Sequence, residues 1–113
     1  MIEAYSFGSL TFAGKRYQKD LKILGGEVRA GWWRKEGHRV DVGDVEDILE
    51  AAPAILVVGM GANGLMRVSD RLEQTLADKQ IQLIAQPSAK AAKTFNQLTG
   101  EGKDVAGAFH LTC

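Results

Sequence analysis

The stretch of sequence that decides the fold is residues 54–64, AILVVGMGANG. Its first five residues are apolar, and no polar residue alternates with them. A strand with this pattern is covered on both faces, as a central strand between helices is. Glycines then break the chain at positions 59, 61 and 64. The stretch therefore predicts a central strand of an α/β sheet that ends in a tight turn.

Helix and strand signals alternate after this strand and begin shortly before it. A helix is predicted over residues 44–52, with Asp44 as its N-cap and Pro53 directly after its end. The further predicted segments are a helix from Ser69 to Lys79, a strand over residues 81–85, a helix that Pro87 opens at its first position and Gly100 ends, and a strand over residues 105–111. This order predicts parallel strands joined by helical crossovers, with helices on both faces of one sheet.

The first forty residues have the pattern of strands. Gly25-Gly26 follows an apolar run and predicts a two-residue hairpin turn, because both turn positions favour positive φ. Val28, Ala30 and Trp32 recur at every second position, which is typical of a half-buried strand. The N-terminal part is therefore expected to add an antiparallel β-hairpin region to the sheet.

Length and composition favour one small globular domain. The 113 residues are 45% hydrophobic and 25% charged, the usual balance of a folded globule. Residues 1–43 carry 8 basic and 5 acidic side chains, and residues 44–113 carry 6 and 9, so the totals of 14 and 14 cancel. This weak asymmetry argues against a nucleic-acid partner. No apolar run has the length of a membrane span or a signal peptide, so we expect no membrane association and a cytoplasmic location.

Five motifs together resemble those of the Mth938-like domain family. They are Phe7-Gly8-Ser9-Leu10, Gly14-Lys15-Arg16-Tyr17 with Asp20, Trp33-Arg34-Lys35-Glu36-Gly37-His38, Leu56-Val57-Val58-Gly59 with Gly61, and the terminal run from Ala106 to Cys113. The resemblance covers residues 1–113 and implies a single three-layer α/β domain with a central mixed sheet. It implies no established enzymatic activity. Relatives associated with adipogenesis and with assembly of respiratory complex I make a binding or assembly role the expectation.

The glycine loop is the first candidate site. Its spacing matches a dinucleotide-binding motif, but the next helix cap, Ser69, comes late and no acidic residue follows the next strand, which argues against that ligand. Loops at the carboxyl ends of parallel strands nevertheless bind ligands, and the amides of residues 60–64 could form an anion nest. Gly59, Met60, Gly61 and Asn63 are therefore ligand-binding candidates. The alternative is that the glycines only permit a tight turn.

Aromatic and basic residues stand together before the first helix. Trp32 and Trp33 are followed by Arg34 and Lys35, a combination that is used to bind single-stranded nucleic acid. Neighbouring residues of a strand point to opposite faces, so both rings cannot form one stacking platform. We interpret Trp32 and Trp33 as candidates for contact with a partner protein, since exposed Trp and Arg are good interface anchors.

His110 and Cys113 suggest a thiol–imidazole pair. An offset of three residues along a strand puts them on opposite faces, and the terminal carboxylate beside Cys113 disfavours a thiolate. His110 is instead a candidate to face the glycine loop. No carboxylate stands at metal-ligand spacing from either histidine, so no metal site is predicted.

The leading hypothesis is a small binding or assembly module rather than an enzyme. Its functional surface would join the glycine loop with Arg34 and His110 in a mildly basic pocket for a small anion or another protein, with no cofactor. One alternative is a small hydrolase or redox enzyme that uses His110 and Cys113. Another is an oligomerising structural subunit that uses Trp32 or Trp33.

Overall fold

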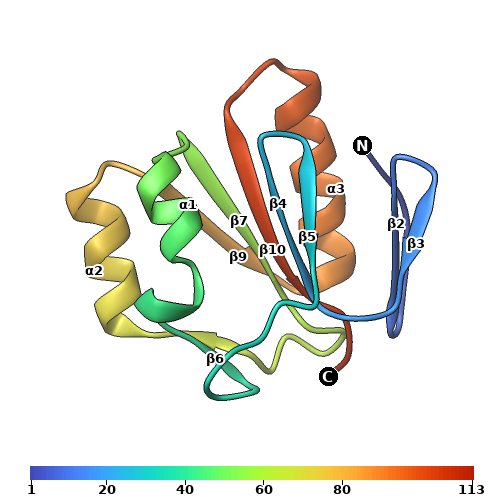
Figure 1. Cartoon of the computed structure of the whole chain (residues 1–113), viewed down its shortest axis with the longest axis horizontal. Coiled ribbons are helices and arrows are strands. Elements are labelled where there is room, and N and C mark those ends of the chain that lie inside the picture. The colour runs from blue at the N-terminus through green and yellow to red at the C-terminus, as the bar shows by residue number, and fades with distance from the viewer.

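A mixed five-stranded sheet forms the centre of the protein, whose computed structural model describes residues 1–113 (Figure 1). The strand order is β5-β4-β10-β7-β9. The strands are β4 Leu21–Leu24, β5 Glu27–Ala30, β7 Ile55–Met60, β9 Gln82–Gln86 and β10 Val105–His110. β7 pairs in parallel with β9 and β10, whereas β4 is antiparallel to β10 and β5. The predicted α/β fold with a central mixed sheet is confirmed.

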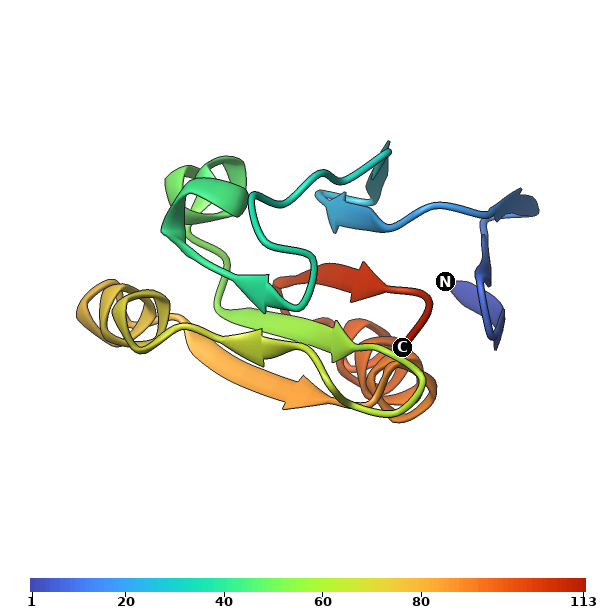
Figure 2. The same cartoon turned by 90° about the horizontal axis from the view of Figure 1, so that it is seen from below.

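Helices cover both faces of this sheet, as the uninterrupted apolar run of β7 predicts. The helices are α1 Glu46–Ala51, α2 Asp70–Asp78 and α3 Ser88–Gly100. Alternate residues of β7 enter different cores: Ile55 and Val57 pack in the core with α3, and Leu56 and Val58 in the core with α1 and α2. Figure 2 shows α3 below the sheet and α1 above it. Two layers of helices therefore remove both faces of β7 from water, a favourable term of about 25 cal/mol per Å² of apolar surface.

A three-stranded antiparallel sheet precedes the central one. It consists of β1 Ile2–Ser6, β2 Ser9–Phe12 and β3 Lys15–Tyr17. Ile2, Leu10 and Phe12 join the core to which α3 contributes. The side-chain amide of Asn96 in α3 bonds both the backbone N–H and the carbonyl of Ile2, at 2.8 and 2.7 Å. The N-terminal region is thus a small sheet that is hydrogen-bonded to α3. It contains more strands than the predicted hairpin region alone.

The helix predicted from residue 44 begins later. Residues Val42–Asp44 form a short 3₁₀ helix, and α1 starts at Glu46 with Val45 as its N-cap. Asp44 is not the N-cap of α1, because its carboxylate accepts from the backbone of Asp41 and of Lys35. Asp41 and Asp44 instead form a capping box for the 3₁₀ helix. Local side-chain bonds thus compete successfully with the helix start that the apolar stripe suggests.

Other boundaries also differ from the prediction by a few residues. β5 ends at Ala30, because Gly31 adopts a φ of +69° and turns the chain, so Trp32 is buried outside the strand. Pro87 is the N-cap of α3 rather than its first residue, and Gly100 is its last helical residue. The hairpin at Gly25-Gly26 is confirmed. Ser69 is confirmed as the cap of α2, where its hydroxyl accepts from the amide of Leu72.

Two two-residue strands, β6 Arg39–Val40 and β8 Arg67–Val68, pair in parallel below the central sheet (Figure 1). Arg67 also donates its backbone amide to the carbonyl of His38 at 2.9 Å. The loop before β6 is therefore joined to the loop after β7. None of the helices combines the length and the hydrophobicity that crossing a bilayer requires.

An ion-pair group on α1 generates a prediction about stability. The carboxylate of Asp47 lies 2.8 Å from Lys22 Nζ and 2.9 Å from Arg29 Nη1, on β4 and β5. Burial alone would raise the pKa of Asp47, but the hydrogen bond and charge of Lys22, aided by the Ile48 amide and Arg29, lower it. A carboxyl whose pKa is lower in the folded state stabilises the fold above its unfolded pKa and loses this contribution as pH falls through the folded value.

We expect Asp47→Asn to lower the free energy of unfolding by about 1 kcal/mol at pH 7, because both partners are partly exposed to solvent. The difference from the unmodified protein should begin to shrink below about pH 4, the usual pKa of an aspartate in the unfolded chain, and should go on shrinking as pH falls toward the lowered pKa of the folded Asp47. Urea denaturation at pH 7 and pH 3 measures both values. Asp104→Asn, on an exposed loop, is the matched control and should change neither. An Asp47→Asn difference that is independent of pH would contradict this account.

Candidate functional site

Segments distant in sequence meet where β7 and β10 end. His110 is the last residue of β10 and pairs with Met60, the last residue of β7. Asp20 precedes β4, and Arg34 lies in the loop between β5 and β6. Of these residues, Arg34 and His110 are buried although they carry polar side chains. This end of the sheet therefore contains a buried group of ionisable residues, which is unusual in a small domain.

The carboxylate of Asp20 is the centre of this group. Its Oδ1 accepts from the backbone amide of Leu111 at 2.8 Å, and its Oδ2 lies 2.8 Å from His110 Nδ1. Oδ2 is also 2.9 Å from Arg34 Nη1, close enough for an ion pair, although the Nη1 hydrogens are not aligned to donate. The Asp20 carbonyl accepts from the Trp32 amide at 2.8 Å. Asp20 thus contacts both the end of β10 and the loop that follows β5.

Arg34 is held in place from three sides. Its Nε and Nη2 donate to the carbonyl of Gly37, at 3.3 and 2.7 Å. Its guanidinium stacks on the ring of Trp32, 4.5 Å from the ring centroid. The indole of Trp32 in turn donates to the carbonyl of Asp44 at 2.8 Å. The Arg34 side chain is only 5% exposed, so its charge is balanced chiefly by Asp20 rather than by water.

The two neighbours of His110 Nδ1 settle which ring nitrogen carries the proton. A carboxylate only accepts hydrogen bonds and a guanidinium only donates them, so Asp20 and Arg34 make opposite demands on Nδ1. Arg34 Nη2 is 3.2 Å away, whereas Asp20 Oδ2 is 2.8 Å away. The shorter, charge-assisted bond assigns the proton to Nδ1. In the neutral ring the lone pair is then on Nε2, and this atom is buried without a hydrogen-bond partner in the protein.

The glycine loop lies directly against His110. A β-carbon at Gly61 would stand 2.9 Å from His110 Cδ2 and 2.7 Å from the carbonyl oxygen of Thr112. The Gly61 amide donates to the hydroxyl of Ser88 at 2.9 Å, and that hydroxyl donates to the carbonyl of His110. The backbone of the loop therefore replaces a side chain as the cover of the imidazole ring.

Several amides of the proposed anion nest are engaged within the protein. The amide of Ala62 donates to Thr112, that of Gly64 to Gly61, and that of Gly61 to Ser88. The amide of the exposed residue Asn63 makes no hydrogen bond within the protein. The assignment of Gly59, Met60, Gly61 and Asn63 as ligand-binding residues stays a prediction.

The structure brings some of the other candidates together and separates others. His110 lies between Arg34 and Gly61 of the glycine loop and is in contact with both. Trp32 is buried, whereas Trp33 is 76% exposed. Cys113 is exposed, and no hydrogen bond joins it to His110.

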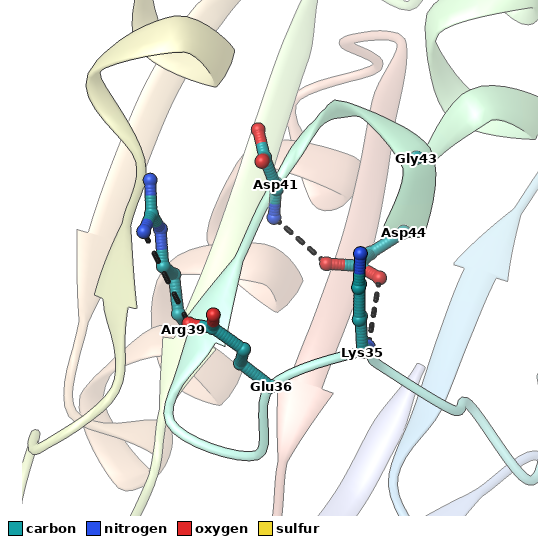
Figure 3. Close-up of a pocket in the computed structure, with 6 residues that line it drawn as sticks. All are labelled: Lys35, Glu36, Arg39, Asp41, Gly43 and Asp44. Carbon is teal, nitrogen blue, oxygen red and sulfur yellow. Dashed lines mark hydrogen bonds and ion pairs between the residues drawn. The ribbon is translucent and has the colours of Figure 1, made fainter.

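The hollows of the molecule lie outside this group. One, of about 210 Å³, is lined by Lys35, Glu36, Arg39, Asp41, Gly43 and Asp44 (Figure 3). Its two aspartates are occupied as caps of the 3₁₀ helix, and the hydrogen bonds from Val42 and Ser69 lower the pKa of Asp41. The other hollow lies between β1 and α3.

Sequence reasoning missed the role of Asp20. The residue stands alone between two short strands, and nothing in its local pattern indicates a partner ninety positions away. Its presence among the motifs of the family resemblance was the one signal that pointed to it. The tautomer of His110 depends on this contact and was not predictable without it.

Gly61 allows a test of the loop packing. Its φ of +96° strains any other residue, and its missing β-carbon would meet three atoms within 2.9 Å, two of them backbone oxygens. We expect Gly61→Ala to lower the free energy of unfolding by about 3 kcal/mol. Gly100→Ala, where the added carbon meets nothing, should stay within about 1 kcal/mol of the unmodified protein. Thermal and urea denaturation compare the two variants, and equal effects would refute the packing argument.

The comparisons with known proteins agree with this architecture. A family model described as a protein of unknown function (DUF498/DUF598) matches residues 2–110. The solved structure of MT938 is 27% identical, with a TM-score of 0.84 over 100% of this chain and 98% of its own. The hypothetical protein PH1505 from Pyrococcus horikoshii is 24% identical, with a TM-score of 0.85 and coverage of 100% and 99%.

A third structure carries the family name that the sequence motifs suggested. It is a solution structure of a Bordetella pertussis protein described as a Mth938-like domain, 18% identical, with a TM-score of 0.77 and coverage of 98% and 85%. At that identity it supports the fold alone. The match of the family model over almost the whole chain carries the assignment: this protein belongs to the DUF498/DUF598 family of Mth938-like domains.

Proposed function

We propose that this protein is a binding module that contacts a partner protein through its strand-end surface. We define this surface as residues 7–8, 31–38, 61–66 and 111–113, segments that all lie at the lower end of the molecule in Figure 1 and are spread around that end in Figure 2. The observation that carries the proposal is the position of its exposed apolar side chains. Of the four large hydrophobic residues that are exposed, Phe7, Trp33 and Leu65 lie on this surface, at 65, 76 and 52% exposure.

The segments that hold these three side chains are all anchored to the end of the central sheet. Gly8, next to Phe7, donates its amide to the carbonyl of Leu111 at 2.8 Å. The loop of Leu65 is bonded to Met60 and to Thr112 through its neighbours. Arg34, next to Trp33, contacts Asp20 and His110. Exposed apolar groups on anchored turns lose little conformational freedom on binding, which favours recognition of a partner.

A small anion, or an acidic group of the partner, is the narrower form of this proposal. Its support is the free amide of Asn63 and the neighbouring contact between Arg34 and His110. Against it stands the engagement of the other loop amides, so we rank it below recognition through apolar side chains.

We expect Trp33→Ala combined with Leu65→Ala to reduce recovery of the bound partner by roughly tenfold or more, since exposed Trp anchors often dominate interfaces. The measurement is affinity capture from the cells that produce the protein, quantified by mass spectrometry. Lys103→Ala, in the exposed turn at the other end of β10, is the control and should leave recovery unchanged. The proposal fails if the double variant and the control recover the same proteins in equal amounts.

Self-association through the same surface is the competing outcome, and light scattering separates the two. A monomer at all concentrations supports a foreign partner. If the protein is instead a dimer and the Trp33→Ala variant is a monomer, the protein is an oligomerising structural subunit that associates with itself through this surface.

For the narrower proposal, we assume that phosphate or acetate binds with a Kd of about 1 mM. Concentrations roughly 10-fold to 100-fold above this Kd should then raise the free energy of unfolding by roughly 1 to 3 kcal/mol. Thermal unfolding at constant ionic strength measures this shift. Arg34→Lys keeps the charge but removes the planar fork, and should lose most of it. Equal shifts in chloride would show a salt effect without a site.

A further inference from the structure

His110 has a second feature that recognition of a partner does not require. Its side chain is 8% exposed, and its Nε2 has no hydrogen-bond partner within the protein. Because Nδ1 donates to Asp20, the lone pair of the ring is on Nε2. Asp20 and Arg34 both lie at Nδ1, and no protein group hydrogen-bonds Nε2.

We propose that His110 is a proton-accepting site for a ligand that offers a hydroxyl, amine or amide hydrogen. The carboxylate–imidazole arrangement is the one that orients a general base, with the carboxylate on one ring nitrogen and the reacting group on the other. A ligand donor first forms a hydrogen bond to Nε2. In full transfer, the donor O–H or N–H bond breaks, its electron pair stays on oxygen or nitrogen, and the proton moves to Nε2.

Asp20 is the positioning residue of this site. It fixes the plane and the tautomer of the ring, and its negative charge lies beside the imidazolium that proton transfer would create. Arg34 is already committed to Gly37 and to Asp20, and it balances the Asp20 charge while His110 is neutral. Three further titratable residues lie near the ring. The ring centroid of His38 is 5.9 Å away at an angle of 72°, Tyr5 donates its hydroxyl to the carbonyl of Leu111, and Cys113 places its backbone oxygen beside Gly61.

The cover over the ring edge that carries Nε2 is formed in part by backbone. Gly61 approaches Cδ2, the ring carbon bonded to Nε2, and has no side chain there. A ligand that reaches Nε2 has to displace this backbone cover, which the hydrogen bonds from Gly61 to Ser88 and from Ala62 to Thr112 hold in place.

The first test reads the tautomer in the unmodified protein, so it does not depend on a variant that folds. Long-range ¹H–¹⁵N correlation spectra of the ¹⁵N-labelled protein at about pH 7.5, above the usual pKa of a histidine, distinguish protonated from bare ring nitrogens. We expect His110 to show a protonated Nδ1 and a bare Nε2. A proton on Nε2, alone or together with Nδ1, overturns the proposal.

The second test measures reactivity with diethyl pyrocarbonate as the probe. The Nε2 lone pair attacks a carbonyl of the probe, an N–C bond forms, and the C–O bond to the ethyl carbonate group breaks. The ring then loses its Nδ1 proton, and protonated ethyl carbonate decomposes to ethanol and carbon dioxide. We expect His110 to be modified and Asp20→Asn to slow this reaction by roughly tenfold, because the positive charge that develops on the ring during attack loses its neighbouring carboxylate. Mass spectrometry of peptides gives both histidine rates in one sample.

Exposed His38 is the internal control, and its rate should be the same in the Asp20→Asn variant. Asp104→Asn is the control for loss of an acidic residue and should leave both rates unchanged. No modification of His110 while His38 reacts fully overturns the proposal, and so does an Asp20→Asn rate equal to that of the unmodified protein. None of these results depends on Trp33 or Leu65, so partner recognition and proton acceptance are tested separately.

Discussion

The carboxylate of Asp20 is the contact on which this end of the molecule depends. It bonds the backbone after β10, orients the imidazole of His110 and neutralises the buried charge of Arg34. A buried ion pair returns little net stability, because desolvation of both charges offsets their attraction. Loss of one partner is costly, however, since it leaves the other charge buried and unpaired. Such a group therefore acts mainly to hold distant segments in one arrangement.

The glycine loop and the loop of the two tryptophans both pack against Asp20, Arg34 and His110, but through different kinds of contact. On one side, backbone approaches the imidazole so closely that only glycine fits at position 61. On the other, the guanidinium of Arg34 lies on the ring of Trp32, while Trp33 points outward. The buried side chain of Trp32 thus fixes the backbone that carries the exposed side chain of Trp33. The same packing displays an apolar surface and shields the free nitrogen of His110.

The charged residues of the chain divide into two kinds of group. Asp47, Lys22 and Arg29 form a partly exposed network between α1 and the strands β4 and β5. Water and salt weaken each of its contacts. Arg34 and His110 are buried beside the half-buried Asp20, and a buried polar atom without a partner costs about 1 to 3 kcal/mol. A protein that keeps such an atom at the edge of its sheet accepts a lower stability than apolar residues would allow. Functional sites are where such local conflicts are expected.

The sequence by itself determined the layers of this fold. The unbroken apolar run at residues 54–58 required cover on both faces, Gly25-Gly26 required a hairpin, and Ser69 marked the start of α2, because each of these signals is local. Only the tertiary structure decided that Asp20 reaches His110, ninety positions away. A carboxylate accepts from any donor that the fold brings within about 3 Å, so its partner is set by topology and not by its neighbours in sequence.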